Sequence, residues 1–202
     1  MRIETSELNQ LLEMIEEKNL SVVEVIELIK AHDGTNIEEQ RIEAQLSEEQ
    51  LTEAQRLEMG EEVNLVVDYT KTVEEMMELA GLNCPEVNSK NFPIPKELIG
   101  KKVSIKVKLK HYGREISSDD AIAEINKEGF REGIIFELLA LAIKFPDLQR
   151  KFIVVALGAV GHNASEHRHV PVLFVYVRER KLFLFWFDYA WGGCYHFLAV
   201  RK

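Results

Sequence analysis

The sequence predicts an α+β protein in which a helical N-terminal region precedes a domain built on a mixed, largely antiparallel sheet. Three observations support this prediction. The first eighty residues show helical periodicity with capping residues, residues 102–110 alternate strictly between apolar and polar side chains, and the tail is rich in β-branched and aromatic residues. We therefore divide the chain into a helical region, residues 1–82, and a sheet domain, residues 83–202.

The N-terminal region contains repeated helix-start patterns. The capping-box spacing, in which a hydroxyl residue and an acid or amide three positions later satisfy each other's backbone, occurs at Ser21-Val-Val-Glu24, Ser47-Glu-Glu-Gln50 and Thr72-Val-Glu-Glu75. Gly60 and Gly81 end the last two of these helices. The expected role is a helical arm through which copies of the chain can associate as a homo-oligomer.

The sheet domain begins with the alternating strand, whose lysine face we expect to be solvated. Helices are expected over about 118–128 and 134–144, because Ser118-Asp-Asp is an N-terminal cap and Phe145-Pro146 ends the second helix. After them the period changes from helical to extended. The predicted strands are 152–158, a hairpin of 171–177 and 182–187 joined by 178–181, and 195–200.

The charge distribution excludes one class of partner. Residues 1–80 contain 21 acidic and 6 basic residues, a balance of −15 within a chain of net charge −9. Such a surface repels phosphates, so we expect no nucleic-acid partner. The sequence shows no apolar signal segment and no run long enough to cross a bilayer, so we expect cytoplasmic synthesis and no membrane insertion.

The tail also contains residue types that could carry chemistry. Its His-x4-His-x-His spacing matches no standard zinc template, and Cys194 with His196 lacks a third, orienting group. No glycine-rich phosphate loop or pair of carboxylates is present in the tail. We therefore expect no enzyme, metal or cofactor. The alternative is a zinc- or cysteine-dependent enzyme that uses His162, His167, His169, Cys194 and His196.

Aromatic residues dominate the hairpin and the loop after it. Alternation places Val172, Phe174, Tyr176, Phe183 and Phe185 on one face, while the opposite face is also apolar. Either both faces are covered, or one face is an exposed aromatic patch for a partner. The loop of residues 188–196 combines tyrosine, glycine and small polar residues, as antibody paratopes do.

Several runs resemble the variable proteins of diversity-generating retroelements, particularly those of archaea and their viruses. They are Gly129-Phe-Arg-Glu, Glu137-Leu-Leu-Ala-Leu, Pro146-Asp-Leu-Gln, Val154-Val-Ala-Leu-Gly, His169-Val-Pro-Val-Leu, Trp186-Phe-Asp with Trp191, and the ending Phe197-Leu-Ala-Val-Arg-Lys202. The resemblance covers about residues 100–202. It implies a C-type lectin-like fold in which the first and last strands pair with two helices between them. It also implies a ligand-binding protein of receptor or adhesion type whose C-terminal surface is diversified by adenine mutagenesis. A virion and a cell surface are the candidate locations, and the sequence does not specify the final site.

The resemblance places a variable surface at about residues 160–196, directed at a protein or another surface ligand. Mutated AAC or AAT codons reach most residue types but never Trp, Lys, Glu, Gln or Met, so Trp186 and Trp191 are expected to be fixed scaffold, together with Leu173, Leu184 and residues 197–201. The chain lacks the Trp-Asn-Asp motif of calcium-dependent lectins. The predicted ligand-binding residues are His162, Asn163, Ser165, His167, His169, Val172, Phe174, Tyr176, Phe183, Phe185, Asp188, Tyr189, Ala190, Gly192, Gly193, Cys194, Tyr195 and His196.

Overall fold

The computed structural model describes residues 52–162 and 167–202, and residues 52–202 form one compact unit. The predictions for residues 1–51, including the oligomerisation arm, and those for Asn163 and Ser165 lie outside the described residues. The unit has a mixed α+β fold with a sheet of eight described strands. Its elements are α4 (Glu53–Glu58), β1 (Val63–Asp68), α5 (Val73–Ala80), β2 (Lys102–His111), α6 (Ser118–Lys127), β3 (Phe130–Glu132), α7 (Ile135–Lys144), α8 (Leu148–Lys151), β4 (Ile153–Val155), β5 (Gly161–His162), β6 (Arg168–Tyr176), β7 (Glu179–Trp186) and β8 (Tyr195–Arg201).

The centre of the sheet is strand β8. It pairs antiparallel with β2 on one side, in the register Val107 to Val200, and parallel with β4 on the other. Strand β1 lies outside β2, while β6 follows β4 and pairs with β7 through its opposite edge. The two ends of the sheet are therefore β1 and β7, and the predicted pairing of the alternating strand with the last strand is confirmed.

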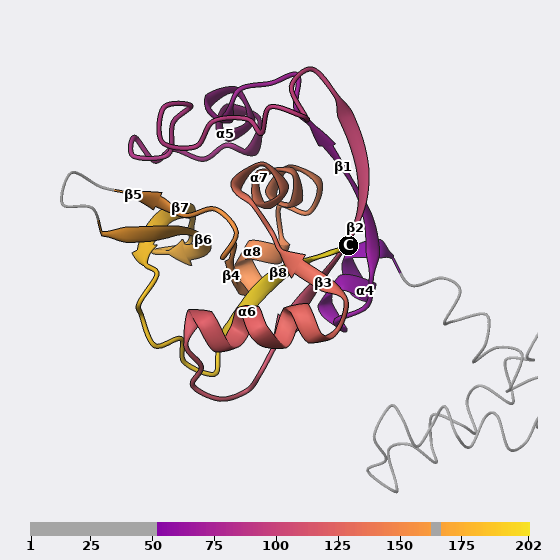
Figure 1. Ribbon diagram of the computed structural model, residues 1–202, viewed down its shortest axis with the longest axis vertical. Coiled ribbons are helices and arrows are strands. Elements are labelled where there is room, and N and C mark those ends of the chain that lie inside the picture. The colour runs from indigo at the N-terminus through magenta and orange to yellow at the C-terminus, as the bar shows by residue number, and fades with distance from the viewer. Residues whose placement is uncertain (1–51, 163–166) are drawn as a thin grey trace, which may run out of the picture. The chain divides into compact units, whose positions relative to one another are not determined.

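Helices cover both faces of the sheet. Figure 1 shows α5 and α7 on one side of the central strands and α6 on the other. The larger core lies beneath α5 and α7, and its strand residues include Leu109, Leu173 and Leu198. The smaller core lies beneath α6 and contains Val172, Trp191 and Phe197. Helices α6 and α7 confirm the two helices predicted between the paired strands.

The predicted boundary at residue 82 is wrong, because the sheet already begins at β1. Val63, Leu65 and Val67 are buried in alternation with exposed or partly exposed neighbours, and β1 pairs with β2 along its whole length. Helix α5 follows from the predicted capping box, in which the Thr72 hydroxyl and the Glu75 carboxylate accept hydrogen bonds from each other's backbone N–H. Residues 52–82 therefore belong to the sheet domain.

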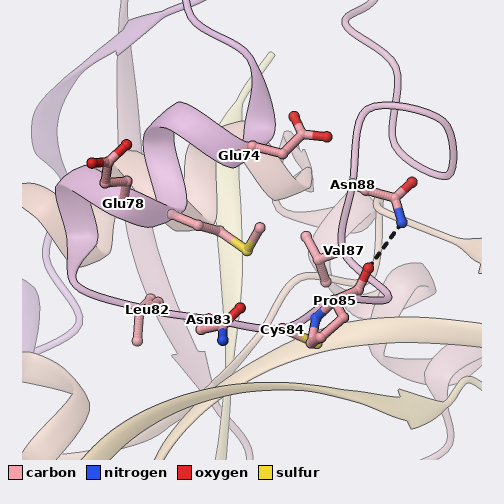
Figure 2. Close-up of a pocket in the computed structure, with 9 residues that line it drawn as sticks. Glu74, Glu78, Leu82, Asn83, Cys84, Pro85, Val87 and Asn88 are labelled. Atoms are coloured by element: carbon pink, nitrogen blue, oxygen red, sulfur yellow. Dashed lines mark hydrogen bonds between the residues drawn. The ribbon is translucent and has the colours of Figure 1, made fainter.

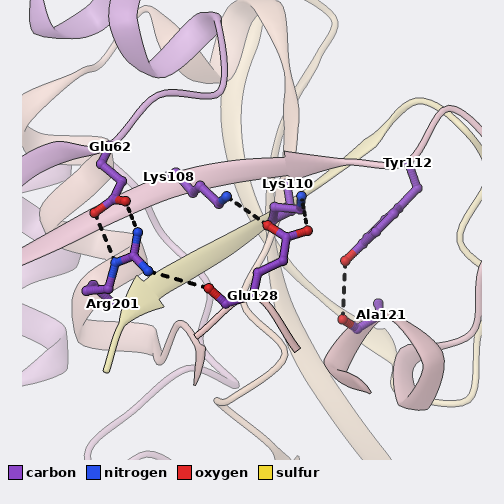
Figure 3. Close-up of polar contacts among 7 residues, drawn as sticks. All are labelled: Glu62, Lys108, Lys110, Tyr112, Ala121, Glu128 and Arg201. Atoms are coloured by element: carbon purple, nitrogen blue, oxygen red, sulfur yellow. Dashed lines mark hydrogen bonds and ion pairs between the residues drawn. The ribbon is translucent and has the colours of Figure 1, made fainter. Parts of the chain in front are cut away.

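The lysine face of β2 is solvated only in its first half, where Lys106 is exposed, whereas the side chains of Lys108 and Lys110 are 16% and 19% exposed. Figure 3 shows that the ammonium groups of Lys108 and Lys110 approach the two carboxylate oxygens of Glu128, at 2.9 and 2.6 Å. Glu128 is the C-terminal cap of α6, and the two lysines lower the pKa of its carboxyl group. Arg201 of β8 binds the Glu62 carboxylate and donates to the Glu128 carbonyl oxygen. These contacts fix the C-terminal end of α6 against β2 and β8.

The hairpin of β6 and β7 is confirmed, but its turn is shorter than predicted. Pairing continues to Tyr176 opposite Glu179, so only Val177 and Arg178 remain in the turn. Both have positive φ angles, 48° and 67°, as a two-residue type I′ hairpin turn requires. Val177 is 76% exposed, and a β-branched residue is unusual at a positive φ angle.

Candidate binding surface

Six aromatic side chains form a continuous surface on the α6 side of the sheet, beyond the part that α6 covers. Five of the rings have ring centroids 5.8–6.3 Å from a neighbour, in the edge-to-face arrangement that aromatic pairs prefer. Tyr176 lies on the same face of β6, two positions after Phe174. Tyr176 is 65% exposed, Phe183 56% and Tyr189 45%, and the other three are half-buried. We call this set the aromatic surface: Phe174, Tyr176, Phe183, Phe185, Tyr189 and Tyr195.

Strand alternation explains why these rings share one face. In the β6–β7 register Val170 lies opposite Phe185 and Val172 opposite Phe183, and side chains two residues apart point to the same side. The first part of this face, Val170 and Val172, is completely buried in the core beneath α6. On the rest of the face, Phe185 packs against that core and is half-buried, while Tyr176 and Phe183 are exposed to solvent.

The loop after β7 is held at both ends by buried residues. The Trp191 ring is fully buried, and its Nε1 donates a hydrogen bond of 2.8 Å to the Ser118 hydroxyl, which in turn donates to the Phe187 carbonyl oxygen. The backbones of Trp191 and Ile116 exchange two hydrogen bonds. The three residues between Phe187 and Trp191, which are Asp188, Tyr189 and Ala190, are exposed.

A charged pair braces the same loop from the start of β6. The Arg168 guanidinium contacts the Asp188 carboxylate and lies 4.0 Å from the centroid of the Phe187 ring. Both side chains of the ion pair are largely exposed, so solvent screens the pair and its contribution to stability is small. Its effect is to orient the loop beside the aromatic surface.

Two polar side chains fix the hairpin against the helices. Gln149 is 3% exposed, and its Nε2 donates to the carbonyl oxygens of Phe174 and Lys181, at 2.7 and 2.6 Å. Arg180 donates from Nη1 to the Ala80 carbonyl oxygen and from Nη2 to that of Ala142, each at 2.9 Å. The hairpin is therefore attached to the C-terminal parts of both α5 and α7. The aromatic surface consequently rests on a rigid support.

The predicted ligand-binding residues do not all reach one surface. Val172 is completely buried and His169 is 9% exposed, so the prediction is wrong for both. Register places His196 on the opposite face of β8 from Tyr195, and the His167 ring stacks on Trp186, on the opposite face of β7 from Phe185. Gly192 and Cys194 lie in the loop after β7, and the side chain of His162 lies outside the described part of the structure. The predicted residues that lie on or beside the aromatic surface are Phe174, Tyr176, Phe183, Phe185, Asp188, Tyr189, Ala190 and Tyr195.

Gly193 also departs from the predicted set of ligand-binding residues, although it is exposed. A Cβ atom on this residue would lie 2.9 Å from the Gly113 carbonyl carbon and 3.1 Å from the Arg114 nitrogen, both of which are backbone atoms. At Gly192 nothing lies within 4 Å of the same position. Gly193 is therefore a scaffold residue, and Gly192 can accept a side chain.

Two further residues near the predicted site differ from expectation: Trp186 is exposed, and His111, which was not predicted, contacts His196 and Gly193. Trp186 was expected to be scaffold, but its side chain is 63% exposed. The His111 ring stacks on His196 at 4.4 Å, and its Nε2 lies 2.6 Å from the Gly193 carbonyl oxygen. The signal for His111 was available in the sequence, because pairing of the first and last strands brings it opposite His196. No pattern signalled the exposure of Trp186, since it follows from β7 being the outermost strand.

The histidines and cysteines do not converge in the described part of the chain. There, no group of three His, Cys, Asp or Glu side chains is arranged to hold a metal ion. The His196 ring contacts the Cys194 backbone oxygen at 3.3 Å, and burial together with the neighbouring His111 lowers the pKa of His196. Cys84 is buried elsewhere, and burial raises the pKa of its thiol to about 11.

A pocket lies on the other side of the domain. Figure 2 shows it between α5 and the loop that follows, lined by residues that include Glu74, Glu78 and Cys84. The protonated Cys84 thiol is a poor nucleophile, and the Glu74 carboxylate accepts a hydrogen bond from the Ser89 backbone at 2.7 Å. None of the predicted ligand-binding residues lines this pocket.

No protein-family model, curated protein or solved structure matches the chain. Among the described residues, no helix combines the length and the apolar character that crossing a lipid bilayer requires.

Proposed function

We propose that the protein is a non-enzymatic binding protein whose ligand contacts the aromatic surface and the loop of residues 188–192. One observation carries this proposal: three large aromatic side chains, Tyr176, Phe183 and Tyr189, are 45–65% exposed on a support that buried residues hold rigid. Burying one such ring against a partner stabilises a complex by about 1.5–3 kcal/mol. Exposed aromatic clusters of this kind are typical of protein interaction sites.

The chemistry of the surface favours an apolar ligand face with polar groups at its edge. Phe174, Phe183 and Phe185 offer rings alone, whereas Tyr189 and Tyr195 add hydroxyl groups. Burial and the neighbouring Tyr189 raise the pKa of Tyr195, which keeps its hydroxyl protonated and able to donate. A protein surface with an apolar patch and nearby carbonyl groups fits this arrangement.

The finer part of the proposal is that the domain is a C-type lectin-like variable protein of a diversity-generating retroelement. Support comes from the pairing of β2 with β8, from the two helices between them and from the position of the exposed residues near the C-terminal end. Strand β1, on the outer side of β2, and helix α5, which packs with α7, are additions to this pattern. The resemblance of residues 100–202 to such proteins provides the rest of the support.

The DNA beside the gene tests the retroelement proposal. We expect a near-copy of the 3′ end next to a reverse-transcriptase gene, differing mainly where the copy has adenine. The differences should fall at codons for exposed residues such as Tyr176, Phe183, Asp188 and Tyr189, and should spare Val172, Trp191 and Gly193. Differences scattered evenly over buried and exposed codons would contradict the proposal.

A second experiment tests the binding surface itself. The triple variant Tyr176→Ser, Phe183→Ser, Tyr189→Ser should unfold at nearly the temperature of the parent chain, because its side chains are exposed. The matched control Trp191→Ser removes a fully buried ring and should cost about 3–5 kcal/mol of unfolding free energy. A comparable loss in the triple variant would show that the aromatic surface is core and would refute the binding proposal.

A further inference from the structure

Strand β7 has an open edge. The backbone N–H and C=O groups of one residue bond β6, and those of the next residue point outward. The Phe187 N–H donates a hydrogen bond to the Arg168 carbonyl oxygen, which shows that the odd-numbered residues of β7 bond β6. The N–H and C=O groups of the even-numbered residues Arg180, Leu182 and Leu184 therefore point away from β6. Nothing among the described residues pairs with these outward groups of Leu182 and Leu184.

The other end of the sheet is covered at one point, which gives a comparison for the open edge of β7. At β1 the outward carbonyl of Asn64 accepts a hydrogen bond of 2.7 Å from the Lys144 ammonium group, and Lys144 is also paired with Glu53. A lysine over an edge strand is a usual means of preventing strand addition. Strand β7 has no proline or bulge and is paired with β6 along its full length, and its two cations, Arg180 and Lys181, have partners within their own chain.

From this contrast we propose that a second copy of the chain pairs with β7 through the same strand, antiparallel, about a two-fold axis at Phe183. The hydrogen-bonding phase restricts the register, because the outward residues are all even-numbered and must lie opposite one another. The axis at Phe183 places Leu182 opposite Leu184 and Arg180 opposite Trp186, whose carbonyl oxygen also accepts a hydrogen bond from the Tyr189 N–H. Phe183 then faces its counterpart in a pair without hydrogen bonds, in which side chains approach most closely.

The side chains in this register are self-complementary. In this register Arg180 lies opposite Trp186 of the other copy and Lys181 lies opposite Phe185, and no like charges face each other. Lys181 also pairs with Glu179 of its own chain, at 2.6 Å. Trp186 is 63% exposed, and the Arg180 guanidinium has carbonyl and amide partners in its own chain and no carboxylate. Two-fold contacts of this kind close on themselves and give a dimer, not a fibre.

The dimer would have a consequence for ligand binding. Two antiparallel edge strands are related by a two-fold axis perpendicular to the sheet. Such an axis keeps the aromatic surfaces of both copies on the same side of the joined sheet. Phe183 and Phe185 of one copy then adjoin those of the other. The two aromatic surfaces form one continuous area, which lets one ligand contact both copies.

Cysteine cross-linking tests the register. In the full chain with Cys194→Ser, the variant Phe183→Cys places two thiols opposite each other in a pair without hydrogen bonds, where Cα atoms are about 4.5 Å apart and a disulfide can form. Mild oxidation should convert most of this variant to a covalent dimer on a non-reducing gel. The matched control Lys181→Cys lies on the same face of the same strand but opposite Phe185, so its thiols stay apart and the chain should remain monomeric on the gel.

Equal cross-linking of the two variants, or none in either, would overturn the proposal. A solution measurement then checks the uncrosslinked chain by sedimentation. The parent chain should have the mass of a dimer, Phe183→Lys should halve it by placing like charges on the axis, and Tyr176→Lys, which lies outside the paired segment, should leave it unchanged. A dimer that survives Phe183→Lys would place the contact elsewhere. Because no ligand is used, these results do not depend on whether the proposed binding function is correct.

Discussion

At the scale of single residues, accessibility separates the residues that can vary from those that hold the surface in place. Neighbouring residues differ sharply: Tyr189 is 45% exposed, whereas Trp191, two positions later, is fully buried and bonded to Ser118. Gly192 and Gly193 differ in the same way, although neither has a side chain, because backbone atoms of Gly113 and Arg114 lie against Gly193 alone.

The two glycines provide a matched pair of substitutions. Gly193→Ala should lower the free energy of unfolding by about 1–3 kcal/mol, because its Cβ would overlap backbone atoms that cannot move aside. Gly192→Ala should be neutral or stabilising by about 0.4–1 kcal/mol, since it restricts the unfolded chain without a clash. Urea denaturation of both variants measures the difference, and equal effects would contradict the packing of Gly193.

Sequence patterns could identify the type of a candidate residue but not its exposure. Alternation correctly placed Val172, Phe174 and Tyr176 on one face, yet Val172 is buried and Tyr176 is exposed. The difference depends on how far α6 extends over the sheet, which is a tertiary property. Likewise, a codon determines only which residue types mutation can reach, and it carries no information on the place of Trp186 in the outermost strand.

At the scale of elements, a buried carboxylate joins three segments. Glu137 in the first turn of α7 is 0% exposed, and its carboxylate accepts hydrogen bonds from Arg131 at 3.0 and 2.5 Å and from the Ile134 N–H at 2.8 Å. The Tyr69 hydroxyl, just after β1, lies 3.4 Å away. Burial raises the pKa of Tyr69, so this hydroxyl stays protonated and donates. The start of α7 is thereby attached to β3 and to the end of β1.

Removing the charge of Glu137 should destabilise the domain more than removing its tyrosine partner. Glu137→Gln leaves Arg131 without its counter-ion and should cost about 3 kcal/mol, near the low end for buried pairs because the arginine side chain is 37% exposed. Tyr69→Phe removes one long hydrogen bond and should cost about 1 kcal/mol. Thermal and urea unfolding of the two variants measure the order, and a larger effect of Tyr69→Phe would be inconsistent with the charge pair as the main contact.

The elements themselves were largely predictable because local signals specify them. The capping box at Thr72, the strict alternation of residues 102–110 and the Phe145-Pro146 stop correspond to α5, β2 and the end of α7. Strand β1 was missed because six residues between two helical patterns carry little local information. Its pairing with β2, forty residues later, is what makes it a strand.

At the scale of the whole molecule, the net charge of the chain lies outside the compact unit of residues 52–202. Residues 1–51 contain 13 acidic and 4 basic residues, a balance of −9, which equals the net charge of the chain. Residues 52–202, the compact unit, contain 21 of each and are neutral overall. The acidic segment therefore provides all of the net charge of the protein.

A truncated chain of residues 52–202 tests this division. We expect it to fold with the same thermal midpoint as the full chain, because the sheet and both cores lie within it. It should pass through an anion exchanger at neutral pH that retains the full chain, and it should be less soluble at low salt because net charge near zero favours association. Failure of the fragment to unfold cooperatively would show that residues 1–51 contribute to the fold.

The exposed segment of residues 188–190 begins after buried Phe187 and ends at the backbone pair of Trp191 with Ile116. This arrangement has a practical consequence. Both ends of this three-residue segment are held independently of what lies between them. A peptide of foreign sequence inserted there would be presented as a closed loop at a defined place, and the sheet would not need to adjust. The domain is therefore suited to engineering as a display scaffold, with the length of that loop as the variable to be screened.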